Sequence, residues 1–168
     1  MSFAVWLTGL SGSGKSAIAR ELIEQLHRRG VDAARLESDV LRTQVTPFPT
    51  YSDAERDLFY GALAALGAFI AAGGRPVIVD ATANRRRYRD AGRQSIVRFA
   101  EVYVDTPLEI CRARDPKGLY RSEKVRALPG LQAAYEPPLV PELVVHGVGG
   151  TPAVAAEKIV AFLVRRGW

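Results

Sequence analysis

The segment GLSGSGKS, residues Gly9–Ser16, follows the pattern G-x-x-x-x-G-K-[S/T] of a phosphate-binding loop. Before it, Phe3–Leu7 is a short apolar run typical of a buried strand, and after it apolar residues recur at helical spacing. Such a strand, loop and helix turn backbone N–H groups and the positive end of the helix toward a phosphate. A glycine-rich turn without a ligand is the alternative, and the Lys-Ser pair in this setting argues against it. We therefore expect the chain to bind a nucleoside triphosphate.

The residues of this loop are expected to hold ATP and Mg²⁺, the two predicted cofactors. Lys15 would reach the β- and γ-phosphates, and the hydroxyl of Ser16 would be a ligand of Mg²⁺. An arginine that follows the fourth expected strand would join them. The predicted ATP-binding residues are Gly9, Ser11, Gly12, Ser13, Gly14, Lys15, Ser16, Ala17 and Arg112.

The composition is that of a single globular domain, residues 1–168, with 48% hydrophobic and 24% charged residues. No apolar run approaches the roughly 20 residues that cross a bilayer. The N-terminus leads directly into the first strand, which leaves no room for a signal peptide. The single cysteine, Cys111, cannot form an intrachain disulfide, so we expect a cytoplasmic protein without membrane contact. The net charge of +5 suits nucleic acid, but equally a pocket that holds several phosphates.

Strands and helices are expected to alternate along the whole chain. The expected strands are 3–8, 33–37, 76–80, 100–104 and 142–146, and the expected helices are 14–29, 53–72, 85–95, 107–113 and 152–166. Threonine followed by proline, in Thr106-Pro107 and Thr151-Pro152, predicts two helix N-caps. This order predicts a three-layer α/β fold, with a five-stranded, mainly parallel sheet and helices on both faces. Glycine and proline gather in 115–141, which we expect to form a mobile lid.

The second expected strand leads to Asp39 and Arg42. Functional groups in parallel sheets gather at the carboxyl ends of the strands, so these side chains would lie beside the bound triphosphate. Asp39 could accept the proton of an acceptor hydroxyl or hold Mg²⁺, while Arg42 would bind an anionic acceptor. The alternative is that Asp39 caps a helix and Arg42 is solvated.

The third expected strand is apolar and ends at Asp80. This is where enzymes with a phosphate-binding loop often place a carboxylate ligand of Mg²⁺. Thr82, Asn84 and Arg85 follow and could line the acceptor site. The alternative is that Asp80 only caps the next helix.

Cations cluster after the fourth expected strand and in the expected lid, namely Arg112, Arg114, Lys117, Arg121, Lys124 and Arg126. A lid that closes over the phosphates would exclude water, so that the phosphoryl group reaches the acceptor rather than solvent. Arg114 would neutralise charge that develops in the transition state. The alternative is a basic, solvated loop.

Four segments resemble the adenylylsulfate (APS) kinase family, which uses MgATP to convert adenosine 5′-phosphosulfate into its 3′-phosphorylated form. The segments are Trp6–Ser16, Val104–Glu109, Arg114–Tyr120 and Tyr135–Pro138. The D-P-K-G-L-Y string within the third segment is far more specific than a phosphate-binding loop. The resemblance implies a P-loop NTPase fold and covers most of the chain.

The resemblance also implies the roles of individual residues. Asp39 and Arg42 match the family's D-G-D-N-x-R segment, and Tyr51 and Arg56 match its F-S-x-x-D-R segment, whose aromatic ring and arginine contact the APS nucleotide. The expected acceptor-binding residues are Arg42, Tyr51, Arg56, Lys117, Gly118, Leu119 and Lys124. The residues expected to act in phosphoryl transfer are Lys15, Asp39, Asp80 and Arg114, and the expected Mg²⁺ ligands are Ser16, Asp39 and Asp80.

The middle of the chain departs from the family where the acceptor is expected. The asparagine of D-G-D-N is Val40, and the family's E-N-I-R-R segment is Leu58–Ala62, which removes an asparagine and two arginines. Ala83 replaces a serine, and Leu128–Gln132 replaces F-T-G-I-D, with the loss of an aromatic ring. Each lost charge-assisted bond weakens binding by roughly 1.5–3 kcal/mol, so these changes predict a weaker affinity for APS.

The leading hypothesis is an ATP-dependent kinase that phosphorylates the 3′-hydroxyl of APS, a small nucleotide acceptor. The family often forms dimers, so a homodimer is also expected. The altered residues favour a different small acceptor as an alternative, such as a cytidine diphosphoramidate-type nucleotide or another hydroxyl metabolite. The basic run Arg85–Arg87 leaves open a nucleic-acid 5′-end kinase, although no further basic stripe with interleaved aromatics occurs. The N-K-x-D segment of guanine-nucleotide switches is absent.

Overall fold

The computed structural model describes residues 2–121, 128–131 and 133–168. Its strands are β1 (Ala4–Thr8), β2 (Ala34–Glu37), β3 (Val77–Asp80), β4 (Phe99–Asp105) and β5 (Leu143–His146). Its helices are α1 (Lys15–His27), α2 (Ser38–Val45), α3 (Asp53–Ala72), α4 (Arg86–Ser95), α5 (Leu108–Arg114) and α6 (Pro152–Arg165). All expected elements are present, with ends that differ from the prediction by at most two residues.

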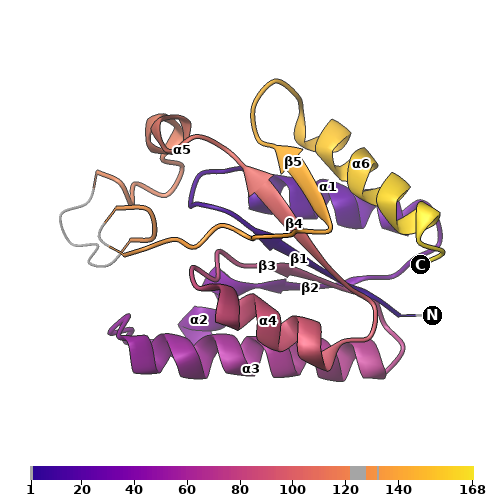
Figure 1. Ribbon diagram of the computed structural model, residues 1–168, viewed down its shortest axis with the longest axis horizontal. Helices are drawn as coiled ribbons and strands as arrows, with labels where there is room; N and C mark the ends of the chain where they lie inside the picture. The colour runs from indigo at the N-terminus through magenta and orange to yellow at the C-terminus, as the bar shows by residue number, and fades with distance from the viewer. Residues whose placement is uncertain (1, 122–127, 132) are drawn as a thin grey trace.

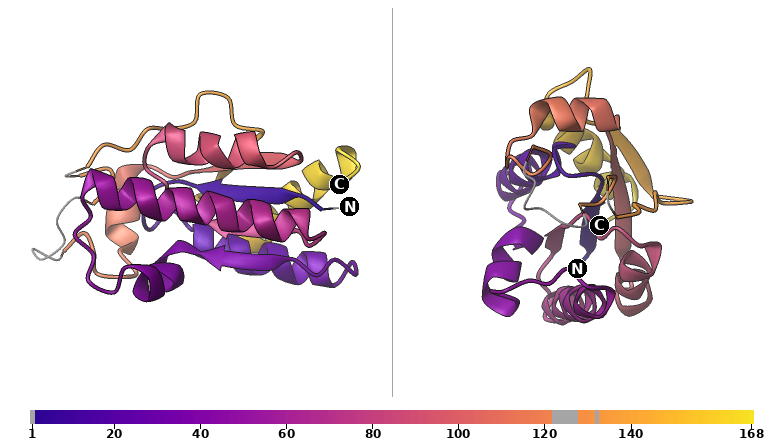
Figure 2. Two further views of the ribbon diagram at one scale, coloured as in Figure 1. Left: turned by 90° about the horizontal axis from the view of Figure 1, so that it is seen from below. Right: turned by 90° about the vertical axis from the view of Figure 1, so that its left-hand side faces the viewer.

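The five strands form one parallel sheet in the order β2-β3-β1-β4-β5. Helices α1 and α6 cover one face of the sheet, and α3 and α4 lie side by side on the other (Figures 1 and 2). These are the three layers that the sequence predicts. The carboxyl ends of β1, β2 and β3 meet at one end of the sheet, where ligands bind in folds of this type.

Strand β1 lies at the centre of the sheet and is buried along its whole length. Val5 and Leu7 pack into the core beneath α1 and α6, whereas Ala4 and Trp6 pack into the core beneath α3 and α4. Successive residues of a strand point to opposite faces, so a strand covered on both faces needs apolar side chains at consecutive positions. This explains the continuous apolar run that precedes the phosphate-binding loop.

Helix α2 is not among the elements that the sequence predicts. It begins directly after β2, and none of its residues is buried. Without a buried face, no apolar periodicity marks the segment as a helix. Asp39 and Arg42 therefore lie on a helix rather than in a loop after the second strand.

The two predicted N-caps have different outcomes. The hydroxyl of Thr151 accepts from the N–H of Val154 at 3.3 Å, and a proline is the first residue of α6, as predicted. The prediction for Thr106 is wrong, because Pro107 is the N-cap of α5. The Thr106 hydroxyl instead donates to the carbonyl of Ser13 at 2.9 Å, which ties the end of β4 to the phosphate-binding loop.

The described parts of the expected lid, 115–121 and 128–131, lie beyond the carboxyl end of the sheet, and 133–141 leads back to β5 (Figure 1). Residues 122–127 and 132 of this segment lie outside the described residues, and the mobility of the lid stays a prediction. Within the described ranges, none of the helices has the length and apolar character that spanning a membrane requires.

Candidate active site

A cavity of about 870 Å³ opens at the carboxyl ends of β1, β2 and β3. Its wall comes from the phosphate-binding loop, α2, the start of α3 and the described lid. The predicted site residues in this wall are Ser11, Gly12, Gly14, Lys15, Ser16, Ala17, Asp39, Arg42, Tyr51, Arg56, Asp80, Arg114, Lys117 and Leu119. Gly9, Ser13, Arg112 and Gly118 are described but lie outside the wall. The remaining predicted residue, Lys124, lies outside the described residues.

The backbone of the phosphate-binding loop takes a conformation that glycine adopts without strain. Gly9 has a φ of +150° and Gly12 a φ of +78°. A Cβ at Gly9 would lie 2.6 Å from the carbonyl oxygen of Val104, and one at Gly12 would lie 2.7 Å from the carbonyl oxygen of Cys111. Both distances are far shorter than a van der Waals contact. The glycines therefore let the loop pack directly against β4 and α5.

Lys15 is buried at the base of the cavity, with 8% of its surface exposed. Its Nζ donates to the carbonyl oxygens of Gly9 at 2.8 Å and Leu10 at 2.7 Å. Burial lowers the pKa of the ammonium group from 10.5 to about 8, and the negative charge of Asp80 offsets part of this effect. A bound phosphate would offer this amine a charged partner in place of the two carbonyls.

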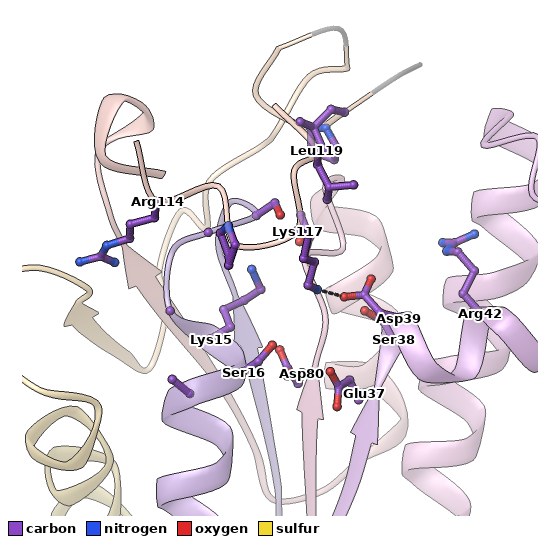
Figure 3. Close-up of a pocket in the computed structure, with 18 of the residues that line it drawn as sticks. Lys15, Ser16, Glu37, Ser38, Asp39, Arg42, Asp80, Arg114, Lys117 and Leu119 are labelled. Atoms are coloured by element: carbon purple, nitrogen blue, oxygen red, sulfur yellow. Dashed lines mark hydrogen bonds and ion pairs between the residues drawn. The ribbon is translucent and has the colours of Figure 1, made fainter. Parts of the chain in front are cut away.

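Asp80 lies at the end of β3 beside Ser16, and Figure 3 shows both side chains pointing into the same space. The Asp80 carboxylate is 3% exposed and accepts from Arg35 Nη2 at 2.7 Å. The same guanidinium lies 3.0 Å from the carboxylate of Glu37. Helix α4 begins only at Arg86, so the alternative in which Asp80 caps the next helix is wrong.

Ser16 and Asp80 supply oxygen donors of the kind that Mg²⁺ binds. Mg²⁺ in nucleotide sites uses one or two carboxylates together with water and substrate phosphates. Across the described ranges, no three or more His, Cys, Asp or Glu side chains are grouped closely enough to hold a metal by themselves. The residues therefore fit a Mg²⁺ that binds together with a nucleotide, rather than one held by the protein alone.

Asp39 faces the cavity from the first turn of α2 and forms an ion pair with Lys117 of the lid (Figure 3). Both side chains are exposed, Asp39 by 62% and Lys117 by 44%. The alternative in which Asp39 caps the helix is wrong, because Glu37 is the N-cap of α2. The ion pair connects the wall formed by α2 to the lid.

Arg42 is held by α3 and is not a solvated side chain. Its Nη1 donates to Glu55 at 2.9 Å, and its Cζ lies 3.9 Å from the centre of the Phe59 ring. Although burial raises the pKa of Glu55, hydrogen bonds from Thr50 and Tyr51 and the charge of Arg42 hold it below its usual range. The guanidinium is therefore oriented before any ligand binds.

Arg56 lies beside Arg42 at the same end of the cavity and is buried. Its Nε donates to the carbonyl of Tyr51 at 3.0 Å, and its Nη1 donates to Oδ1 of Asn84 at 2.9 Å. Tyr51 has a φ of +56°, which is uncommon for a residue with a side chain. Its ring centre lies 5.2 Å from Cζ of Arg42 and 5.9 Å from Cζ of Arg56. The ring of Tyr51 and two guanidinium groups thus gather at this end, with Asn84 behind Arg56 as a support.

The basic run Arg85–Arg87 does not form a free phosphate-binding face. Arg85 pairs with Asp53 at 2.6 Å, and Arg87 pairs with Asp57, both on α3. These contacts fasten α4 to α3. The expectation that Arg85 lines the acceptor site is therefore wrong, and the main argument for a nucleic-acid substrate is lost.

The family model described as adenylylsulphate kinase matches residues 1–146. The chain belongs to this family. It is 37% identical over 142 residues to the adenylyl-sulfate kinase of Rippkaea orientalis, covering 83% of this chain and 78% of that protein. It is 32% identical over 167 residues to the adenylyl-sulfate kinase of Halothermothrix orenii, covering 98% of this chain and 90% of that protein.

Solved structures agree with this assignment. The APS kinase CysC of Mycobacterium tuberculosis, in complex with AMPPNP and APS, superimposes with a TM-score of 0.90 at 32% identity, over 97% of this chain and 98% of that chain. Shikimate kinase from Acinetobacter baumannii, at 17% identity and a TM-score of 0.69, shares the fold. The chain therefore has the three-layer P-loop NTPase fold that the sequence predicts.

Only some of the departures from the adenylylsulphate kinase pattern face the cavity. Gly61 and Ala62 stand where the pattern has two arginines, but they are exposed on α3 and lie outside the cavity wall. Phe59, in place of the asparagine, is buried beneath Arg42. Tyr60 belongs to the wall. The expectation that all these changes fall in the cavity wall is thus wrong for Gly61 and Ala62.

The D-P-K-G-L-Y string of the family forms a turn that is fastened to the phosphate-binding loop. The carboxylate of Asp115 accepts from the N–H of Tyr120 at 3.1 Å, which closes the turn. The Tyr120 hydroxyl donates to the carbonyl of Ser11 at 2.8 Å. Lys117, within this turn, is thereby placed over the cavity.

Arg114 takes a different direction from the one its predicted role requires. Its Nη2 donates to the carbonyl of Gly147 at 2.6 Å, and Figure 3 shows the side chain directed away from Lys15. To act on a transferred phosphoryl group, this side chain would have to turn, and its role stays a prediction.

Two residues of the site, Arg35 and Tyr60, are not predicted from the sequence. Arg35 and Glu37 are two residues apart, so both side chains lie on the same face of β2. Two charged residues at alternate positions of a short strand are the sequence pattern that would have indicated Arg35 as a site residue. Tyr60 follows Arg56 by one helical turn, which places both on one face of α3.

Proposed function

We propose that this adenylylsulphate kinase-family chain transfers the γ-phosphoryl group of ATP to the 3′-hydroxyl of APS, giving 3′-phosphoadenosine 5′-phosphosulfate (PAPS). One observation carries the proposal: a single cavity has the phosphate-binding loop at one end and Arg42, Tyr51 and Arg56 at the other. The M. tuberculosis enzyme with the same fold was solved with AMPPNP and APS together, which supports the same pair of ligands here.

We assign the donor end of the cavity to the phosphate-binding loop. Lys15, which bonds two loop carbonyls in the structure, would bind oxygens of the β- and γ-phosphates. Ser16 and Asp80 would hold Mg²⁺, with Arg35 fixing the orientation of the Asp80 carboxylate. When bound, Mg²⁺ supplies positive charge that neutralises the phosphate oxygens.

We assign the acceptor end to the residues of α2 and α3. Asp39, once released from Lys117, would orient the 3′-hydroxyl and accept its proton as the new O–P bond forms. Arg42 and Arg56 would bind the anionic phosphosulfate, because their guanidinium groups are already oriented. The ring of Tyr51 would stack on the adenine base.

The lid would complete the site by excluding water. Lys117, Leu119 and the predicted cations Arg114 and Lys124 belong to this segment, and its turn is already attached to the phosphate-binding loop through Tyr120. A closed lid directs the phosphoryl group to the acceptor rather than to water. Homodimer formation, a cytoplasmic location and a single domain over 1–168 are further predictions from the sequence.

The direct test is release of ADP from MgATP by the purified protein, with APS as acceptor and PAPS identified as the product. A cytidine diphosphate-linked nucleotide and a 5′-hydroxyl oligonucleotide are the comparison acceptors. We expect saturable turnover with APS and only background hydrolysis with the other two. Turnover with another acceptor and none with APS would refute the APS assignment and leave the donor end intact.

A different small acceptor is the second candidate. It is favoured by Phe59 in place of the family's asparagine and by Leu128 in place of an aromatic ring, since both changes reduce the polar or stacking contacts expected for an adenylyl nucleotide. The same comparison of acceptors decides between the two candidates.

A further inference from the structure

Tyr60 lies in the cavity wall beside the residues assigned to the acceptor and has no role in the proposal above. Its ring stacks on Tyr88 with the centroids 4.6 Å apart and meets Phe59 edge-on at 5.3 Å. Cζ of Arg42 lies 5.8 Å from the ring centre. Only 6% of the residue is exposed, so the ring is fixed on every side except the cavity.

Two donor groups lie near the hydroxyl of Tyr60, the backbone N–H of Ala83 and the guanidinium of Arg42, and both offset part of the rise in its pKa that burial causes. The backbone of Ala83 itself has an unusual conformation. Its φ is +42°, which is strained for a residue with a side chain. The carbonyl of Ala83 accepts from Arg89, which is 1% exposed and bonds Glu101 at 2.5 Å, so a buried ion pair holds the strained backbone in place.

A phenol oxygen has two lone pairs and one proton. Both neighbouring groups are donors, so neither of them can accept the phenol proton. Because Tyr60 belongs to the cavity wall, a ligand in the cavity can supply the acceptor for this proton. Burial raises the pKa of Tyr60, so the hydroxyl keeps its proton at neutral pH.

The charged groups near the hydroxyl indicate which kind of ligand atom it would bind. Arg42 and Arg56 both act on it electrostatically, which favours a negatively charged oxygen at the cavity side of the phenol. We propose that Tyr60 is a specificity-determining residue that donates a hydrogen bond from its hydroxyl to an anionic oxygen of the phosphoryl acceptor. The identity of that acceptor rests on the proposed function.

The E-N-I-R-R pattern of the family offers no hydroxyl at this position. Phe59 removes the amide of the family's asparagine, and the next residue supplies a hydroxyl where the E-N-I-R-R pattern has isoleucine. The hydrogen-bonding group has thus moved by one position along α3, from a side chain buried beneath Arg42 to one in the cavity wall.

The test compares Tyr60→Phe with Tyr88→Phe in steady-state kinetics. Tyr60→Phe removes one hydroxyl and keeps the stacked ring, so we expect KM for APS to rise about tenfold, the usual effect of losing a hydrogen bond to a charged group. The turnover number and KM for MgATP should stay within about twofold. Tyr88 is the matched control, because its ring stacks on Tyr60 while its hydroxyl donates to Asp57 at 2.8 Å, away from the cavity.

An unchanged KM for APS in Tyr60→Phe would overturn the proposal, and so would equal changes in both variants, since these would reflect the aromatic stack. If the wild-type protein does not phosphorylate APS, the proposed function fails on that measurement alone. The role of Tyr60 is then decided by inorganic sulfate at saturating MgADP. Sulfate should raise the melting temperature of the wild type and of Tyr88→Phe more than that of Tyr60→Phe, and equal shifts in all three would refute the anion contact.

Discussion

The two ends of the cavity are built in different ways. The donor end comes from one continuous segment, in which Gly9 and Gly12 shape the backbone and Lys15 supplies the charge. The acceptor end is assembled from side chains of α2, α3 and the β3–α4 connection. Arg42 is oriented by Glu55 and Phe59, and Arg56 by Asn84. The first end depends on backbone conformation, and the second on contacts between distant segments.

This difference shows which part of the site can vary within the family. The loop packs so closely against β4 and α5 that a Cβ added at Gly9 or Gly12 would overlap a backbone carbonyl, so these two positions tolerate almost no change. A group of side chains can exchange one hydrogen-bonding residue for its neighbour, as Phe59 and Tyr60 illustrate, provided that the charged groups keep their supports.

The largest effect is expected from Lys15→Ala at the donor end. Loss of this buried cation should reduce phosphoryl transfer by at least about a thousandfold, the scale of removing one positive charge from the transition state. Lys158→Ala, on the exposed face of α6, is the control and should be silent. Turnover measured as ADP release, with circular dichroism to verify the fold, is the readout. A variant that keeps most of its activity would show that the donor end is assigned wrongly.

At the acceptor end, Asp39→Asn should lower turnover by about 10²–10³-fold, the usual contribution of a positioned general base. Binding of MgATP, measured by calorimetry, should be unchanged, because Asp39 pairs with the lid rather than with the phosphate-binding loop. Asp90→Asn, on the exposed face of α4, is the control. Equal loss of MgATP binding and turnover would remove the distinction between the two ends.

The buried charge of Lys15 should make stability depend on pH. Its pKa falls from 10.5 in the unfolded chain to about 8 in the folded one, so between these values the unfolded state binds more protons. The free energy of unfolding should therefore rise with pH through this window, by at most roughly 3 kcal/mol, relative to Lys15→Met. Urea unfolding of both proteins from about pH 7 to about pH 10.5 measures the difference. A constant difference would mean that Lys15 is not desolvated in the absence of a ligand.

The smallest effect is expected from two glycine substitutions, which distinguish the cost of backbone strain from the cost of a steric clash at the donor end. Gly12 and Gly30 both have a φ of +78°, but a Cβ at Gly12 would meet the Cys111 carbonyl at 2.7 Å, whereas one at Gly30 would meet nothing within 4 Å. Gly30→Ala should cost about 1 kcal/mol of stability from strain alone, and Gly12→Ala about 1–3 kcal/mol. Only Gly12→Ala should also raise KM for MgATP. Equal behaviour of the two variants would show that contact with α5 is unimportant.

The fold was largely predictable because most elements carry a buried face. β1 is marked by consecutive apolar residues, and α6 by the Thr151 cap followed by proline. Helix α2 lacks any buried residue, so its existence depends on position after β2 and not on apolar spacing. Thr106 has the local sequence of a cap, but a bond to Ser13, 93 residues away, takes its hydroxyl.

The site likewise contains residues that local sequence patterns reveal and residues that depend on contacts between distant segments. The phosphate-binding loop and Asp80 can be found from local patterns, since a continuous segment and a strand end define them. Arg35 could not be placed at Asp80 without knowing that β2 and β3 are neighbours, with Glu37 opposite Asp80. The D-G-D-N-x-R motif was enough to predict Arg42 as a site residue. The contact between Arg42 and Phe59 depends on the packing of α2 on α3, which the motif does not reveal.

The ion pair between Asp39 and Lys117 has a consequence for the order of events during turnover. Both partners are largely exposed, and such pairs contribute only about 0–1 kcal/mol, so separating them slows no step by more than roughly fivefold. While the acceptor is absent, Lys117 neutralises the charge of Asp39, the proposed base. When the acceptor binds, the pair can separate without slowing turnover appreciably. Raising the ionic strength should therefore change substrate association more than the rate of the chemical step.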